Sequence, residues 1–219
     1  EKPMADTIGR AEEMLTACAR NNVKLVIGHQ RRFLPTYELA RNFIADGAIG
    51  NVEILAAYTG HGLPNWTTHL VDLFRFMLSN DECTWVMGAV ERQTDRYERN
   101  TRIEDRAIAT FGFKCGAQGL VFSDMTSHQG QGAKVYGSEG MLDVGEKEIR
   151  ILNNDTGGTW NTHTPDGKFF KHDEPNFESV ESFAHQAYEL ADWIEGKGEH
   201  RGQAKNGYKA LEMIHGIYE

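Results

Sequence analysis

Two short segments of the chain carry side chains that can handle a proton. Lys2 lies in Glu1-Lys2-Pro3, a turn stiffened by its proline, and His69 lies further along, in residues 65–72. An ammonium group can hold negative charge that develops on an oxygen, and an imidazole tuned near neutrality can take up or return a proton. Taken singly, each residue also fits a simpler interpretation: a solvated charge near a terminus, and a histidine packed on a helix.

Residues 66–78 carry apolar side chains at helical spacing, which predicts an amphipathic helix. His69 and Asp72 are three residues apart, so the two side chains share one face of that helix. Asn65, four residues before His69, can donate and accept hydrogen bonds but cannot titrate.

Composition excludes several classes of function. The chain has 219 residues, 40% of them apolar and 25% charged, which is typical of a soluble globular protein. A formal net charge of −9 disfavours a nucleic-acid binder. No apolar run approaches the ~20 residues that span a bilayer, and no signal peptide is visible at the start of the sequence. We therefore expect a cytoplasmic protein without nucleic-acid or membrane partners.

Cysteine, histidine and glycine spacing argues against a metal centre and a phosphate-binding loop. Cys18, Cys83 and Cys115 are widely separated and form no C-x-x-C pair, as expected for buried apolar residues in a reducing compartment. The nine histidines include no H-x-x-x-H pair, so we expect no metal site. Residues 130–132, Gly-Gln-Gly, precede a predicted strand and lack a third glycine, so they are interpreted as a turn.

The order of predicted elements indicates an α+β fold. Short β-type segments follow one another without intervening helices through the middle of the chain, which favours one broad, mainly antiparallel sheet. Residues 153–176, rich in Asn, Asp, Gly, Thr and Pro, are predicted to run over the surface. The predicted helices are 4–21, 35–45, 66–78, 178–195 and 205–218, and the predicted strands are 23–27, 51–58, 84–91, 107–113, 117–123, 133–136, 141–144 and 148–152.

The chain resembles the C-terminal domain of the glucose–fructose oxidoreductase/inositol dehydrogenase (Gfo/Idh/MocA) family of NAD(P)-dependent oxidoreductases, nearly from end to end. Any one of the matching segments alone is a weak signal, but together and in this order they are a strong one. The segments are Glu1-Lys2-Pro3, residues 26–35 (Val-Ile-Gly-His-Gln-Arg-Arg-Phe-Leu-Pro), 47–52 (Gly-Ala-Ile-Gly-Asn-Val), 65–72 and 136–140 (Tyr-Gly-Ser-Glu-Gly).

The resemblance implies an open, mainly antiparallel sheet with helices packed on one face, in a protein whose nucleotide-binding Rossmann domain lies outside this sequence. Residues 1–28 would be the tail of the Rossmann unit and the junction, and residues 29–219 the substrate-binding and oligomerisation domain. The uncovered face of the sheet would serve as a contact between subunits. NAD or NADP would be bound mainly by the other domain, so the chain by itself is expected to be inactive.

The resemblance also implies roles for individual residues. Asn65 departs from the family, which usually has aspartate there. The predicted catalytic residues are Lys2, His69 and Asn65; the predicted substrate-binding residues are Asp72, which could also orient His69, together with Arg31 and His128; Lys2 and Pro3 are predicted to lie against the cofactor.

Two functions remain open from the sequence. The first is hydride transfer between a nicotinamide and a sugar, polyol or related polyhydroxylated compound. The second is a non-catalytic sugar sensor or oligomerisation module of the same lineage, which Asn65 slightly favours and the presence of Lys2, His69 and Asp72 disfavours.

Overall fold

The computed structural model describes residues 1–98, 100–124, 131–165 and 177–219 of the chain. Its frame is one eight-stranded sheet, beside which lies a two-stranded hairpin. The sheet contains β1 (Val52–Thr59), β2 (Cys83–Glu91), β5 (Arg106–Phe113), β6 (Gln118–Ser123), β7 (Gln131–Gly137), β8 (Gly140–Val144), β9 (Ile149–Asn153) and β10 (Asn161–His163), and the hairpin pairs β3 (Tyr97–Glu98) with β4 (Thr101–Arg102).

The strand order is β10-β9-β8-β7-β1-β6-β5-β2. Neighbouring strands run antiparallel, except that β1 and β6 are parallel. That pair arises because the whole helical segment between β1 and β2 returns the chain to the edge of the sheet, after which β5 and β6 fold back toward β1. The predicted open, mainly antiparallel sheet is confirmed.

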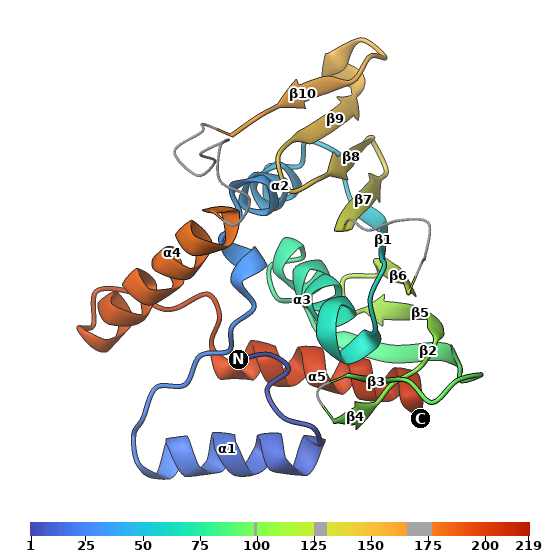
Figure 1. The fold of residues 1–219 in the computed structure, drawn as a ribbon. Coiled ribbons are helices and arrows are strands. Elements are labelled where there is room, and N and C mark those ends of the chain that lie inside the picture. Colours follow the sequence, from blue (N-terminus) through green and yellow to red (C-terminus); the bar gives the residue numbers. More distant parts are fainter. Residues whose placement is uncertain (99, 125–130, 166–176) are drawn as a thin grey trace.

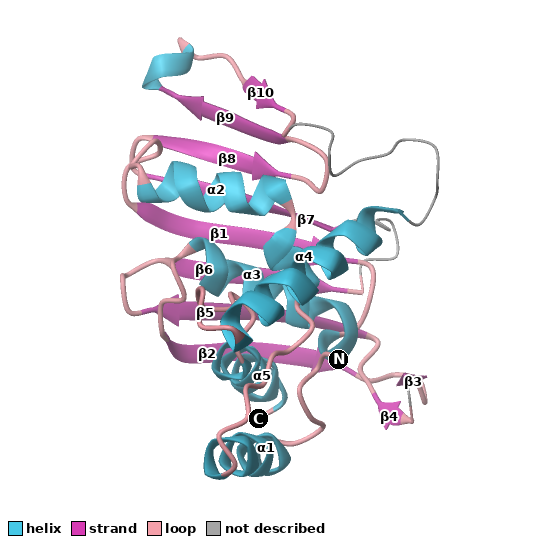
Figure 2. Ribbon diagram, turned by 90° about the vertical axis from the view of Figure 1, so that its left-hand side faces the viewer, coloured by secondary structure: helices cyan, strands magenta, loops and turns pink. Residues whose placement is uncertain are grey.

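The helices gather on one face of this sheet, as Figures 1 and 2 show from two sides. Shorter helical segments precede two of these helices or lie between strands. The long helices are α1 (Ile8–Arg20), α2 (Pro35–Ala45), α3 (Thr68–Met77), α4 (Phe177–Ile194) and α5 (Ala204–Tyr218), and the short ones are the 3-10 helices η1 (Gln30–Phe33) and η3 (Asn154–Thr156) and the π-helix η2 (Leu63–Thr67).

The helix α3 is the centre of the molecule, since every one of its residues is buried. It contacts α2 and α5 on its sides and β1 and β6 beneath it. Its apolar side chains join the inward-facing residues of the strands in one core, which includes Leu70, Phe74, Phe111, Val121 and Val135. Charged residues on α3 are therefore held away from water and must find partners inside the protein.

Sequence patterns located most elements correctly, and the boundaries that differ have physical causes. Helix α2 begins at Pro35, as predicted, because proline suits the first turn, where no backbone donor is needed. The helix predicted to start at residue 66 is preceded by the wider turn η2, which contains Pro64 in its first turn. The segment 153–165 is more ordered than predicted, since it holds η3 and the short strand β10.

The strand predicted at residues 23–27 is wrong. Only Val26 forms a β-bridge, to Gln203, because the segment beside it is the short lead-in to α5 rather than another strand. Ile27 instead joins a second, smaller core with Met4 and Ala11 against α5. Residues 1–28 thus pack on this domain, and the proposed boundary at residue 28 stays a prediction.

A fully buried ion pair joins η1 to α3. Arg32 is 0% exposed and Asp72 is 1% exposed. Arg32 donates from Nε to Asp72 Oδ2 over 2.6 Å and from Nη2 to Asp72 Oδ1 over 2.7 Å. Its Nη1 donates to Asn80 Oδ1 (2.7 Å) and to the carbonyl oxygen of Arg201 (3.0 Å). One side chain therefore ties together η1, the middle of α3, the turn that follows α3 and the connection between α4 and α5.

We predict that Arg32→Leu lowers the free energy of unfolding by about 3–5 kcal/mol, because it leaves the buried Asp72 carboxylate without a partner. The measurement is urea denaturation at neutral pH. Arg10→Leu is the control, since the Arg10–Asp6 pair is exposed and should contribute nothing measurable. Equal midpoints for the Arg32 and Arg10 variants would show that the buried pair does not hold the fold.

Candidate functional site

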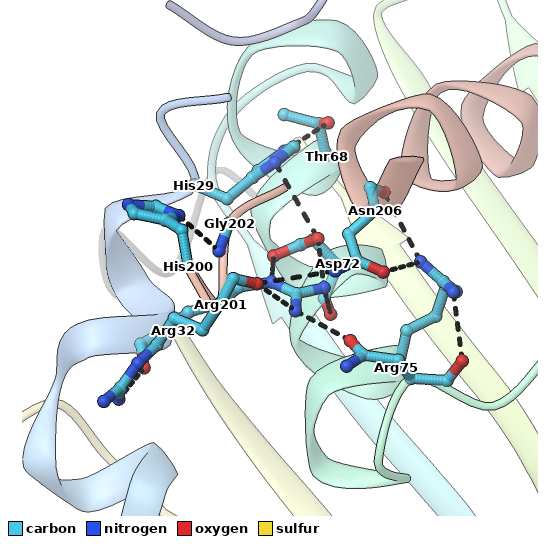
Figure 3. A network of polar contacts seen from close by, with 10 residues as sticks. His29, Arg32, Thr68, Asp72, Arg75, His200, Arg201, Gly202 and Asn206 are labelled. Atoms are coloured by element: carbon cyan, nitrogen blue, oxygen red, sulfur yellow. Dashed lines mark hydrogen bonds and ion pairs between the residues drawn. The ribbon is translucent and has the colours of Figure 1, made fainter. Parts of the chain in front are cut away.

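His69 lies in the first turn of α3, is 4% exposed and packs against a second histidine, His29. The ring centroids are 5.5 Å apart and the ring planes are perpendicular, at 88°. His29 precedes η1 and is 3% exposed. Its Nε2 is 3.2 Å from the hydroxyl of Thr68, and its Nδ1 is 3.7 Å from Oδ1 of Asp72 (Figure 3).

Lys2 reaches this site from the start of the chain and is 9% exposed. Its Nζ donates to Oδ1 of Asn65 over 2.7 Å and also to the backbone carbonyl of Asn65. Asn65 lies in η2, the turn that leads directly into His69. Two residues 63 positions apart in the sequence are thereby brought together beside the predicted base. Pro3 follows Lys2 through a cis peptide bond and is partly buried.

Arg31 enters the same region from η1. Its guanidinium is paired with Glu146 and lies 5.6 Å from the centre of the Trp66 ring. Trp66 is the residue after Asn65, and its ring packs on His61 with centroids 4.2 Å apart. The side chain of Arg31 is 13% exposed, so this cation is neither an exposed surface charge nor part of a basic patch.

The predicted site residues do not all converge. Asp72 was expected to orient His69 or bind substrate. Instead, both of its carboxylate oxygens accept hydrogen bonds from Arg32, and the histidine paired with it is His29. Its direct role toward a substrate stays a prediction. His128 lies outside the described residues.

Burial keeps both imidazoles neutral. It is the largest cause that lowers the pKa of His69 well below 6.5, and the charges of Arg31 and Lys2 and the nearby His29 lower it further. Burial also lowers the pKa of His29, against the opposing effect of Asp72. For Asp72 the balance is reversed: burial raises its pKa, but the charge of Arg32 and the hydrogen bonds it donates bring the pKa below 3.8.

Sequence reasoning missed two residues of this site, His29 and Thr68. Both stand inside segments that carried the family resemblance, next to residues that were selected. The signal available was the concentration of hydrogen-bonding residues in these segments, but a linear pattern cannot show that residues 39 positions apart touch.

A hollow in the described structure lies away from these residues. It has a volume of about 840 Å³ and is lined by the ends of β2, β5 and β6, with Arg96, Asp105 and Asp124 among its polar residues. Among the described residues, no three potential ligands stand together as a metal site would require. No described helix combines the length and the apolar character of a bilayer span.

Residues 55–143 match the family model of the GFO/IDH/MocA C-terminal domain. The resemblance to the Gfo/Idh/MocA family is confirmed. No curated protein matches the sequence.

Solved structures of oxidoreductases share the whole fold. An oxidoreductase domain protein from Kribbella flavida superposes with a TM-score of 0.83 at 19% identity, over 99% of this chain and 69% of its own. Levoglucosan dehydrogenase, in complex with NADH and levoglucosan, gives 0.84 at 16% identity over 99% and 69%. An inositol dehydrogenase homolog from Azotobacter vinelandii, with NADH and myo-inositol, gives 0.80 at 19% identity over 98% and 66%. The chain therefore spans about two thirds of each of these proteins.

We predict that the free energy of unfolding falls as the pH is lowered through 6.5, since the unfolded chain binds protons at His29 and His69 before the folded chain does. His69→Gln should flatten this dependence, because it removes one of the two groups. Urea denaturation at a series of pH values from about 8 to about 5 measures the slope. Identical slopes for the variant and the unmodified chain would show that His69 is not held neutral by the fold.

Proposed function

We propose that this chain is the substrate-binding and catalytic part of an NAD(P)-dependent oxidoreductase that transfers a hydride between the nicotinamide and a sugar, polyol or related polyhydroxylated compound. The observation that carries the proposal is the contact of Lys2 with Asn65 beside the buried His69. An amine and an uncharged imidazole held close together, on separate elements, suit a substrate hydroxyl that must lose both a proton and a hydride.

The residues divide the chemistry in the following way. During oxidation, the carbon that bears the hydroxyl loses a hydride to the nicotinamide, while the hydroxyl oxygen loses its proton. His69 accepts that proton, which its neutral form at pH 7 permits. Lys2 donates a hydrogen bond to the same oxygen and stabilises the negative charge that develops there. In the reverse direction His69 returns the proton to the oxygen.

Asn65 has a positioning role in this scheme. Its side-chain and backbone oxygens both accept hydrogen bonds from Lys2, which fixes the direction of the amine. An amide does this without exchanging protons. The substitution of asparagine for the family's usual aspartate therefore preserves the orientation of Lys2 and removes a titrating group from the site.

The nicotinamide supplies the hydride acceptor when the cofactor is bound. Among the residues of this chain, Lys2 and Pro3 are proposed to lie beside it. The partly buried Pro3 would give the flat nicotinamide ring an apolar contact, while the amine of Lys2, held by Asn65, would be directed to the substrate oxygen. We also propose that the cofactor is NAD or NADP, that its phosphates are bound mainly outside this chain, and that the chain by itself is inactive.

The alternative function is a sugar sensor or oligomerisation module without catalysis. The absence of a carboxylate at residue 65 favours it, and the buried pair of imidazoles beside Lys2 disfavours it. A sensor needs hydrogen bonds to its ligand but has no need of an uncharged histidine shielded from water. The two functions differ in one observable, turnover of a bound polyol.

We also propose that the uncovered face of the sheet joins two copies of the chain. Strand alternation places Ala107, Ala109 and Val121 in the core under the helices, so their neighbours in sequence point the other way. The outward positions of β1, β2, β5, β6 and β7 include several large, apolar and exposed residues, and an apolar face of this kind is unusual on a monomer. They are Ile54, Trp85, Met87, Ile108, Phe122 and Tyr136, which are 37–69% exposed.

For catalysis, we predict that Lys2→Ala in the intact gene product lowers kcat by about 10²–10³-fold and that His69→Ala lowers it by about 10²–10⁴-fold. The assay follows NADH or NADPH formation with a panel of polyols, including myo-inositol and levoglucosan. Lys24→Ala is the control, because Lys24 lies against Trp193, away from the site. Asn65→Asp should keep activity and add an acidic limb to the pH–rate profile.

Turnover at the unmodified rate after Lys2→Ala would remove the catalytic interpretation. Binding of a polyol without any turnover in the unmodified protein would select the sensor function instead.

For association, we predict that Met87→Lys converts an oligomer into a monomer, because it places a charge in the apolar sheet face. Tyr188→Lys on α4 is a matched control: both side chains are 69% exposed, but only Met87 lies on the sheet. Light scattering coupled to size-exclusion chromatography measures both masses. A monomeric unmodified chain at every practical concentration would contradict the sheet-face contact.

A further inference from the structure

His29 is held from both of its ring nitrogens. Its Nε2 is 3.2 Å from the hydroxyl of Thr68, and its Nδ1 is 3.7 Å from Oδ1 of Asp72. Asp72 is itself fixed by Arg32 through hydrogen bonds of 2.6 and 2.7 Å. The orientation of the His29 ring is therefore determined by α3 and η1 together (Figure 3).

His69 has no comparable anchor of its own. Its Nδ1 is buried and has no hydrogen-bond partner among the described residues. In histidines that act as bases, a carboxylate or a carbonyl on one nitrogen commonly sets which nitrogen faces the substrate. Asp72, the carboxylate one turn further along α3, is bound to Arg32 instead. What does contact His69 is the perpendicular ring of His29, at a centroid distance of 5.5 Å.

We propose that His29 is a positioning residue for His69: anchored by Thr68 and Asp72, it fixes the plane of the His69 ring by edge-to-face contact. This inference rests on the proposed function only in that His69 is taken as the base. It assigns Asp72 an indirect part, since the carboxylate acts on His69 through the ring of His29. The contacts that orient His69 therefore form a series, from Arg32 to Asp72, from Asp72 to His29 and from His29 to His69.

The charges around the two rings are consistent with this arrangement. Cations face them from the start of the chain and from η1, and among the described residues the carboxylate that acts on the His29 ring is Asp72, from α3. With a net positive surrounding, a second proton on either imidazole is disfavoured, so the contact joins two uncharged rings. The charged groups that act on one or both rings are Lys2, the amino group of Glu1, Arg31, Arg32 and Asp72, and Arg75 acts on Asp72 in turn.

The first test observes His69 directly in the chain, without any assay of activity. Nitrogen-15 NMR of labelled histidine reports the tautomer and the titration midpoint of each ring. In the unmodified chain we expect one tautomer for His69. His29→Ala should give averaged tautomers and move the midpoint upward, because water enters the space left by the ring and weakens the effect of burial.

Two further variants keep the test decisive. Thr68→Val removes only the hydroxyl that anchors His29, so it should change His69 in the same direction even where His29→Ala fails to fold. His163→Ala is the control, since His163 lies at the end of β10 and packs on Phe43, and it should leave the His69 signals unchanged. Unaltered His69 signals in a folded His29→Ala chain, or in Thr68→Val where that chain does not fold, would overturn the inference.

The second test separates this inference from the proposed function. In the intact gene product, His29→Ala should lower kcat by about 10²-fold, as expected for a misplaced base, and leave the KM for the cofactor unchanged. His29→Phe keeps an aromatic ring but cannot make the contacts to Thr68 and Asp72, so it should recover little of the loss. Changed NMR signals in a protein without turnover would refute the function and support the positioning role. Unmodified turnover together with unaltered NMR signals in His29→Ala would support the function and refute the positioning role.

Discussion

The buried ion pair between Arg32 and Asp72 is the contact on which the arrangement of the site depends. A charge placed in the centre of α3 has to be compensated from within the protein, and Arg32 does this with two hydrogen bonds to the carboxylate. The remaining donors of Arg32 reach Asn80 and the carbonyl of Arg201. Arg201 in turn donates to the carbonyl oxygen of Arg32 over 3.2 Å. These contacts thus fix the position of η1 relative to α3. They also hold the connection between α4 and α5 against η1 and α3.

Electrostatics and burial act in the same direction at the two histidines. Burial favours the uncharged form of an imidazole, and the nearby cations of Lys2 and Arg31 favour it further. A histidine in this state is uncharged at neutral pH and has a nitrogen lone pair for a proton, whereas a free carboxylate beside it would raise its pKa. The use of Asp72 by Arg32 is therefore compatible with the role proposed for His69, because it keeps the strongest negative charge away from that ring.

The sheet packs against the helices on one face, and its other face is the one proposed above for association. Its inward side packs against α3, which carries His69, and its outward side presents large apolar residues to solvent. If two copies meet across that outward face, the contact stiffens the surface on which α3 rests. In that case the sheet would position α3 and, through the contact between the two copies, would also form a more rigid support for it.

The sequence by itself determined most of the secondary structure and the residues that could do chemistry. Hydrophobic periodicity is a local property, so it located α2 and the strands β1, β2 and β5 to β9 closely, but it missed the short strands β3 and β4. The positions of Lys2, Asn65 and His69 within recognisable segments indicated the candidate site. Periodicity failed for residues 23–27, because a β-branched run becomes a strand only if another strand lies beside it. Only the tertiary structure decided which polar groups pair. Arg32 and Asp72 are 40 positions apart in the sequence, and His29 is also far from Asp72 in the sequence. From the sequence alone, the Asp72 carboxylate could equally have paired with His69 on the same helix. The packing of η1 onto α3 pairs the Asp72 carboxylate with Arg32, because the free energy of a buried charge depends on its nearest partner in space and not on its neighbours along the chain.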